Sequence, residues 1–209
     1  MIKTLADALA KQGYDVLTPV QSEVSKKEFE SSDLLVSAQT GSGKTVGFGI
    51  AIAPTILKDS VNFDTAGAPL ALVIAPTREL AMQVKRELTW LYGMAKATIA
   101  SCVGGMDMRD ERRSLERGSH IVVATPGRLR DHIQRGSINL SQVKAVVLDE
   151  ADEMLDLGFR EDLEFILSEA PENRRTLMFS ATVPRAIVNL AKSYQKDAIR
   201  ITTVSDTKQ

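Results

Sequence analysis

Short hydrophobic runs recur along the chain, separated by longer segments with helical periodicity. Each run has the length of one strand and is apolar at consecutive positions, as expected for strands covered on both faces. The runs cover residues 34–36, 70–75, 98–100, 121–124, 145–148, 176–179 and 199–201. Strands of this kind that alternate with helices predict an α/β fold with a mostly parallel central sheet and helices on both faces.

The segments between the runs support this prediction. Apolar residues recur at helical spacing across residues 78–92, and Gly93 follows where a helix would end. The longest apolar stretch, residues 46–57, is too short to cross a bilayer and predicts a buried helix that follows a loop, so we expect no membrane span. Residues 59–69 lack periodicity and predict an exposed connection.

Composition limits the chain to a globular domain. Its 209 residues are 44% hydrophobic and 25% charged, which excludes disorder throughout, and no repeat divides it, so we expect one domain over residues 1–209 with a polar tail after about residue 203. The net charge of −1 means that any contact with a polyanion must come from a local patch. A single cysteine, Cys102, and the absence of a signal-peptide pattern predict a cytoplasmic protein without an internal disulfide.

Residues 38–45 read A-Q-T-G-S-G-K-T, directly after a predicted strand and at the start of a predicted helix. Glycines allow the backbone N–H groups to curl around a phosphate, and the helix N-terminus adds partial positive charge. Lys44 can reach the β- and γ-phosphates, and the Thr45 hydroxyl can ligate Mg²⁺. The predicted nucleotide-binding residues here are Gln39, Thr40, Gly41, Ser42, Gly43, Lys44 and Thr45.

Two carboxylates, Asp149 and Glu150, follow the strand predicted at 145–148. Because α/β proteins bind ligands at the carboxyl ends of their strands, Asp149 is expected to hold Mg²⁺ and Glu150 to activate the attacking water. Without the phosphate loop, two adjacent acids would more often be the solvated start of a helix. The two motifs together favour hydrolysis of a nucleoside triphosphate.

Asp149-Glu150-Ala151-Asp152 spells D-E-A-D, and the sequence resembles the N-terminal RecA-like domain of DEAD-box RNA helicases. The resemblance covers nearly the whole chain, and its motifs stand in the family's order. They are Gly13-Tyr14 with Thr18-Pro19-Val20-Gln21, residues 38–45, residues 76–81, Gly104-Gly105, residues 125–128, residues 149–152 and Ser180-Ala181-Thr182. The family normally carries alanine at the position of Ala38, which here replaces the first glycine of the general phosphate-loop pattern.

The resemblance implies an ATP and Mg²⁺ site. The segment at about residues 13–21 corresponds to the Q motif, whose Tyr14, Thr18 and Gln21 would contact the nucleotide, with Gln21 reading the adenine edge. Lys44, Asp149 and Glu150 would be the catalytic residues, and Thr45 and Asp149 the metal ligands. The aromatic residue that stacks on adenine in this family precedes the start of this chain.

The resemblance also implies an RNA track and a coupling element. The RNA-binding residues would be Pro76, Thr77, Arg78, Gly104, Gly105, Thr125, Pro126, Gly127 and Arg128. Arginines, hydroxyls and helix N-termini suit contact with the backbone of single-stranded or duplex RNA and do not sense base identity. Asp152, Ser180 and Thr182 would relay the nucleotide state to the RNA.

The function implied is an ATP-dependent RNA helicase that unwinds short duplexes locally once this domain is joined to a second RecA-like domain. That second domain and its arginines are absent from the 209 residues, so we expect the isolated chain to be nearly inactive in ATP hydrolysis. Two alternatives stay open: a binding module without catalysis, and a helicase that acts on DNA.

Several other residues favour structural explanations. Arg109, Arg113 and Arg117 share one helical face with acids nearby, which is typical of a solvated face of mixed charge. His120 and His132 lack spacing that indicates a metal site. Cys102 is expected to be a buried apolar residue and Trp90 a packing residue.

Overall fold

The computed structural model describes residues 1–203, and these form one α/β domain built on a single sheet of seven strands, all parallel. The strands are β1 (Leu34–Ser37), β2 (Ala71–Ile74), β3 (Ile99–Cys102), β4 (Ile121–Ala124), β5 (Ala145–Leu148), β6 (Arg175–Ser180) and β7 (Ile199–Thr202). Their order across the sheet is β3-β4-β2-β5-β6-β1-β7. The predicted fold class is therefore confirmed. The polar tail expected after residue 203 lies outside the described residues.

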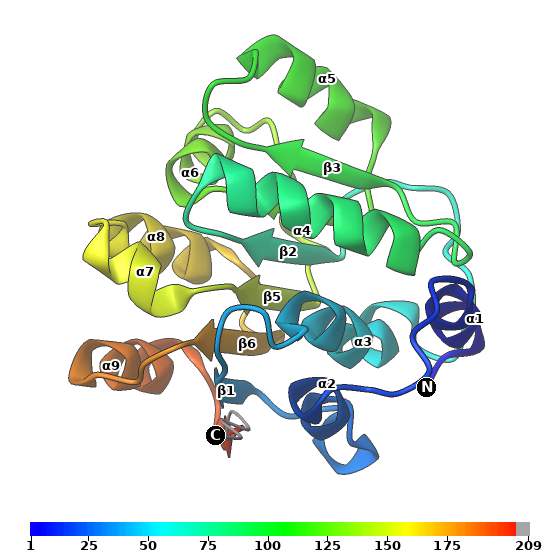
Figure 1. Cartoon of the computed structure of the whole chain (residues 1–209). Helices are drawn as coiled ribbons and strands as arrows, with labels where there is room; N and C mark the ends of the chain where they lie inside the picture. Colours follow the sequence, from blue (N-terminus) through cyan, green and yellow to red (C-terminus); the bar gives the residue numbers. More distant parts are fainter. Residues whose placement is uncertain (204–209) are drawn as a thin grey trace.

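Helices connect the strands (Figure 1). They are α1 (Lys3–Lys11), α2 (Pro19–Val24), α3 (Lys44–Leu57), α4 (Arg78–Leu91), α5 (Met108–Arg117), α6 (Pro126–Gln134), α7 (Ala151–Asp156), α8 (Arg160–Glu169) and α9 (Arg185–Tyr194). A short 3₁₀ helix covers Lys27–Phe29. Within residues 1–203, no helix is long and apolar enough to cross a membrane.

The strands alternate between two hydrophobic cores, one on each face of the sheet. In β1, Leu34 and Val36 pack into the core formed with α1, α2, α3 and α4, whereas Leu35 packs into the opposite core. That second core contains apolar residues of α6, α7, α8 and α9. Because side chains alternate along a strand, a strand buried on both faces must be apolar at every position, which is the pattern of the sequence.

The parallel arrangement gathers all the loops that follow the strands at one edge of the sheet. The ends of β1, β6 and β5 are neighbours there, since Val36 pairs with Phe179 and Leu148 pairs with Met178. The ends of β2, β4 and β3 continue the same edge. The loops after β1, β5 and β6 carry the predicted nucleotide and coupling residues, and those after β2, β3 and β4 carry the predicted RNA residues.

The connection over residues 59–69 is more firmly attached than the sequence suggests. Phe63 stacks on the His120 ring with centroids 4.4 Å apart, and His120 Nε2 lies 2.8 Å from the carbonyl oxygen of Asp64. His120 Nδ1 accepts a hydrogen bond from the backbone N–H of Thr98 at 2.8 Å. Both ring nitrogens are thus used inside the fold, as expected for a structural histidine.

Candidate functional site

The loop between β1 and α3 has the backbone that its glycines predict. Gly41 and Gly43 both have φ of +80°, a left-handed conformation that strains other residues. A Cβ atom at Gly43 would also lie 2.5 Å from Gln21 Nε2. Ser42 Oγ is buried and has no hydrogen-bond partner within residues 1–203, so a polar group inside this loop is left for a ligand.

Lys44 joins this loop to the acids that follow β5. Its Nζ lies 2.8 Å from Asp149 Oδ1 and 3.1 Å from Glu150 Oε1. The Asp149 side chain is fully buried and that of Lys44 is 8% exposed. Burial raises the pKa of Asp149 above its ordinary value, and the Lys44 ammonium partly offsets this effect. The two motifs therefore meet at one place on the sheet edge.

Glu150 reaches this place through an unusual backbone. It has φ of 51° and ψ of 54°, a left-handed conformation that costs a non-glycine residue free energy. Helix α7 begins at the next residue, so Glu150 turns the chain sharply out of β5 and directs its carboxylate to Lys44. Such strain is typical of functional positions.

The polar atoms of Asp149 suit a divalent cation. Neither carboxylate oxygen has an aligned hydrogen-bond donor in the described part of the chain, although the Lys44 ammonium lies close to Oδ1. Mg²⁺ prefers carboxylate and hydroxyl oxygens beside phosphate. Thr45, which is also buried, is the second residue of α3 and follows Lys44 directly. The oxygen atoms present here thus fit a Mg²⁺ ion, and the assignment of Asp149 and Thr45 as its ligands stays a prediction.

Gln21 fastens α2 to the phosphate loop. Its Nε2 donates to the Gly43 carbonyl at 3.0 Å, and its Oε1 accepts from the backbone N–H of Thr18 at 3.0 Å. Thr18 Oγ1 accepts in return from the Gln21 N–H, which completes a capping box. The structure thus brings Thr18 and Gln21 to the loop, and the adenine contact of Gln21 stays a prediction.

Tyr14 contacts α4. Its ring stacks on Trp90 of α4, with centroids 5.5 Å apart and planes 19° apart, and the residue is 43% exposed. Tyr14 therefore packs against α4, and its contact with the nucleotide stays a prediction.

Asp152 is bonded to the loop after β6. Its Oδ2 accepts from the Thr182 N–H at 3.0 Å and from the Thr182 hydroxyl at 2.9 Å. Ser180 Oγ accepts from the Asp152 N–H at 3.3 Å and donates to the Thr182 carbonyl at 2.6 Å. Partial burial opposes ionisation of Asp152, but the hydrogen bonds from Thr182 outweigh it and hold the pKa of this carboxyl below its usual value.

The predicted RNA residues follow three adjacent strands. Thr77 caps α4 by accepting from the Leu80 N–H at 3.2 Å, and the exposed Arg78 follows it. Gly105 lies against Arg78, since a Cβ atom there would be 2.6 Å from Arg78 Nη1. The loop with Thr125, Pro126, Gly127 and Arg128 starts α6 beside them, and the Thr125 N–H donates to the Cys102 carbonyl at 3.0 Å.

Known proteins share the sequence pattern and the fold of this chain. The sequence profile of a family described as DEAD/DEAH box helicase matches residues 18–190. The chain belongs to this family. Relatives include a DEAD-box ATP-dependent RNA helicase CshA of Geobacillus kaustophilus, 43% identical over 91% of this chain and 39% of its own length. Another is DEAD-box ATP-dependent RNA helicase 9 of Oryza sativa, 42% identical over 98% of this chain and 32% of its own length.

Solved structures show that this DEAD-box chain has the fold of the family. A DEAD box protein of Methanococcus jannaschii superposes with a TM-score of 0.87 at 38% identity, covering 97% of this chain and 54% of its own. A protein of Sulfolobus tokodaii described as a hypothetical ATP-dependent RNA helicase gives 0.86 at 33% identity, over 97% of this chain and 57% of its own. The chain is thus the N-terminal, RecA-like DEAD-box domain, and it spans well under two thirds of its relatives.

Arg175 and Glu111 are among the buried charged residues of this DEAD-box domain that the sequence did not indicate. Arg175, at the start of β6, is 5% exposed and donates to the carbonyls of Ser32, Ala51 and Phe29. Glu111, also 5% exposed, lies on α5 among exposed charges and bonds to Arg128 and His132. His132 therefore has a carboxylate partner that its spacing did not indicate. Only the apolar run beside Arg175 could have signalled a buried charge.

The rest of α5 agrees with the sequence interpretation. Arg109, Arg113 and Arg117 are exposed, and Arg113 Nη1 lies 3.8 Å from Asp110 Oδ1. Cys102 is buried, as expected, and burial together with the nearby Glu111 charge raises the pKa of its thiol to about 12. Trp90 packs against Tyr14.

The hydrogen bonds of Asp152 give a pH dependence that can be measured. Because its pKa is lower in the folded than in the unfolded chain, the ionised carboxylate stabilises the fold above the unfolded pKa of about 4, and this contribution is lost as pH falls through the folded pKa. We expect Asp152→Asn to reduce the free energy of unfolding by about 1 kcal/mol at pH 7, after allowance for solvent screening. In urea titrations the difference should shrink below pH 4. A difference that grows on acidification would contradict this assignment.

Proposed function

We propose that this chain is the ATP-binding and RNA-backbone-binding half of an ATP-dependent RNA helicase. In the full-length protein, joined to a second RecA-like domain, it couples binding and hydrolysis of ATP to local unwinding of short RNA duplexes. The observation that carries the proposal is the meeting of Lys44, Asp149 and Glu150 within 3.1 Å at the mouth of a glycine loop. Here the Lys44 ammonium, a group that can bind phosphate, contacts one buried carboxylate, Asp149, and one partly exposed carboxylate, Glu150.

The two acids suit different tasks. Asp149 is buried, and the Lys44 ammonium is the one cation paired with its carboxylate in residues 1–203, so Asp149 would hold Mg²⁺ together with Thr45 once Lys44 turns to the phosphates, and the metal would neutralise charge on the phosphates. The Glu150 side chain is 24% exposed and can approach a water molecule outside the loop. Glu150 would orient that water and accept its proton, while Lys44 leaves the acids for the phosphates.

Efficient hydrolysis requires more than these residues. Phosphoryl transfer in phosphate-transferring enzymes is accelerated about 10³- to 10⁵-fold by an arginine finger, which the second RecA-like domain would supply here. We therefore expect the isolated 209-residue chain to hydrolyse ATP very slowly.

The cytoplasmic location predicted from the sequence stays an expectation, and one relative, from Arabidopsis thaliana, carries a mitochondrial name.

RNA-stimulated hydrolysis by the full-length protein tests the proposal. We expect single-stranded RNA to stimulate hydrolysis more than DNA of the same sequence, because contacts to 2′-hydroxyl groups distinguish the two. Equal stimulation by DNA would favour a DNA helicase. No stimulation by either, with ATP still bound, would favour a binding module without catalysis.

Substitution of Glu150 tests the catalytic assignment. Glu150→Gln removes the proton acceptor but keeps the shape of the side chain, so we expect RNA-stimulated hydrolysis to fall about 100- to 10,000-fold. ATP affinity should change by less than about threefold. Glu153→Gln, an equal change of charge at an exposed position of α7, is the matched control and should retain activity. Full activity of Glu150→Gln would show that another group activates the water.

A further inference from the structure

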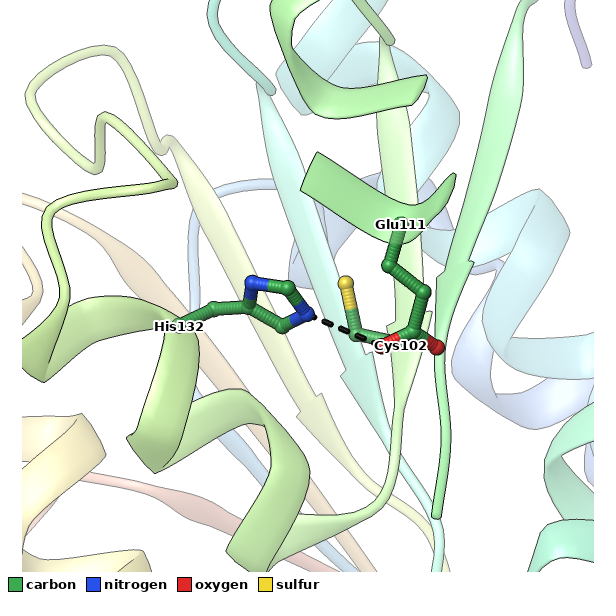
Figure 2. Close-up of side chains that lie close together, drawn as sticks. All are labelled: Cys102, Glu111 and His132. Carbon is green, nitrogen blue, oxygen red and sulfur yellow. Dashed lines mark hydrogen bonds and ion pairs between the residues drawn. The ribbon is translucent and has the colours of Figure 1, made fainter. Parts of the chain in front are cut away.

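A buried carboxylate lies directly behind the predicted RNA track. Glu111 of α5 accepts three hydrogen bonds: Oε1 from His132 Nε2 at 2.9 Å and from Arg128 Nη1 at 3.2 Å, and Oε2 from the Val103 N–H at 2.8 Å. Figure 2 shows Glu111 and His132 facing one another from two helices, with Cys102 beside them. The neighbouring charges on α5 are exposed, whereas Glu111 is turned into the domain.

The proton positions follow from the partners. An ionised carboxylate only accepts hydrogen bonds, so His132 Nε2 carries a hydrogen. His132 Nδ1 is buried without a partner in residues 1–203, and a second hydrogen there would be left unbonded. We therefore assign the neutral Nε2–H tautomer to His132. The Arg128 guanidinium is then the cation that balances the Glu111 charge.

The same cluster has the residue types of a metal site, because ligand atoms of Cys102, Glu111 and His132 lie within 4.8 Å of one another. Its chemistry opposes a cation. Both Glu111 oxygens are already bonded within the fold, and burial raises the pKa of the Cys102 thiol to about 12, so a metal ion would have to displace its proton. The Arg128 guanidinium, whose Nη1 lies 3.2 Å from Glu111 Oε1, would also repel a metal ion beside this carboxylate. The cluster is a hydrogen-bond network.

The network connects two of the predicted RNA loops. Val103 immediately precedes Gly104-Gly105, and Arg128 ends the segment over residues 125–128. One carboxylate thus fixes the backbone at the start of one loop and the side chain at the end of the other. Arg128 itself faces a hollow of about 820 Å³ between α5 and α6, which Arg109, Arg112 and Arg135 also line. A guanidinium has five N–H donors, so binding to Glu111 leaves Arg128 with donors for a phosphate.

We propose that Glu111, supported by His132, is a positioning residue for RNA binding: it holds Arg128 and the Gly104-Gly105 loop in the arrangement that contacts the RNA backbone. The inference rests on the proposed RNA function. It makes a prediction that simple electrostatics does not. From electrostatics alone, removal of any negative charge near bound RNA should strengthen binding. We expect the opposite for Glu111: removal of its charge should weaken binding, because Arg128 loses its orientation.

The test is a double-substitution cycle in the full-length protein. Affinity for a fluorescein-labelled single-stranded RNA is measured by anisotropy with Mg²⁺ and a non-hydrolysable ATP analogue, for wild type, Glu111→Gln, Arg128→Gln and the combination. We expect each single substitution to weaken binding about 5- to 10-fold. In the Arg128→Gln background, Glu111→Gln should cost less than about threefold, since the residue through which it acts is already gone.

Glu116→Gln is the matched control. It removes the same charge from α5, and Glu116 lines the same hollow, but its carboxylate pairs with Arg112 at 3.7 Å and does not touch Arg128. We expect it to bind RNA as tightly as wild type or more tightly. Circular dichroism checks folding, and Glu111→Asp, which keeps the charge but shortens the reach, replaces Glu111→Gln if that variant does not fold; it should also weaken binding.

The outcomes distinguish failure of the proposed RNA function from failure of the positioning role of Glu111 alone. If wild type binds no RNA, or if Arg128→Gln binds as tightly as wild type, the proposed RNA function is wrong at this site and the inference falls with it. If Arg128→Gln weakens binding but Glu111→Gln does not, the positioning role alone is overturned. Equal losses from Glu111→Gln in both backgrounds would likewise overturn it, since they would indicate only a general effect on the fold.

Discussion

Replacing Lys44 by alanine is expected to weaken ATP binding by this chain about 100-fold. Lys44 is the one ammonium group at the phosphate loop within residues 1–203, and it lies 2.8 Å from Asp149. Loss of charge-assisted hydrogen bonds to a triphosphate costs about 3 kcal/mol, which corresponds to about that factor in affinity. Isothermal titration of ATP in the presence of Mg²⁺ measures the change.

The control for this prediction is Lys192→Ala. Lys192 is exposed on α9, so the substitution removes one positive charge from the chain without touching the loop. We expect unchanged ATP affinity. Because Lys44→Ala leaves Asp149 and Glu150 without their cation, the variant's thermal unfolding should be measured in parallel. Undiminished ATP binding by a folded Lys44→Ala would mean that the triphosphate binds elsewhere.

The second large effect concerns stability. Arg175→Met keeps most of the side-chain stem but removes the guanidinium, which donates to the Ser32 carbonyl at 2.7 Å and to the Phe29 carbonyl at 2.8 Å. Burial lowers the pKa of Arg175 to about 10, yet this value keeps it charged at neutral pH. These two carbonyls are part-buried and that of Ala51, which Arg175 also contacts, is buried; a carbonyl left without a donor in such a place costs about 1 to 3 kcal/mol. We expect the free energy of unfolding in urea to fall by about 3 to 5 kcal/mol.

Arg200→Met is the comparison for this substitution. Arg200 is exposed on β7 at the edge of the sheet, and its replacement should change the free energy of unfolding by less than about 0.5 kcal/mol. If Arg175→Met were equally mild, the carbonyls around Arg175 would have found other donors, such as water.

Much of the fold could be predicted because its strands are buried on both faces. Runs such as 121–124 and 145–148 match β4 and β5 residue for residue, since a strand covered on both faces is apolar at every position. The boundaries of edge strands were harder to predict. β3 extends to Cys102, two residues beyond the predicted run 98–100, because its burial alternates and the polar Ser101 interrupts the apolar pattern. Hydrogen bonding to β4 determines that boundary.

The residues of the candidate site were also only partly predictable from the sequence. Lys44, Asp149 and Glu150 could be named in advance because glycine spacing and strand ends restrict where phosphate and metal ligands can lie. Arg175 and Glu111 could not. A buried charge is stabilised by partners distant in sequence, as Arg175 is by Phe29, 146 residues away, and in one dimension it looks like an ordinary surface residue.

The left-handed backbone of Glu150 could not be predicted from the sequence either. The sequence placed the acid at the end of a strand but gave no sign that it would adopt φ of 51°. That conformation follows from the abrupt start of α7 after β5 and from the ion pair with Lys44. Tertiary contacts, not local propensity, determine such angles.

The central claim is that the glycine loop and the two acids bind one Mg²⁺-bound triphosphate, and a crystal structure of the chain with Mg²⁺ and a non-hydrolysable ATP analogue tests it most directly. We predict the triphosphate inside residues 38–45 and Lys44 Nζ transferred from the acids to the phosphates. Asp149 and Thr45 should then face the metal, and Glu150 the space beyond the terminal phosphate. A triphosphate bound away from this loop, or a metal that has neither Asp149 nor Thr45 near it, would contradict the account.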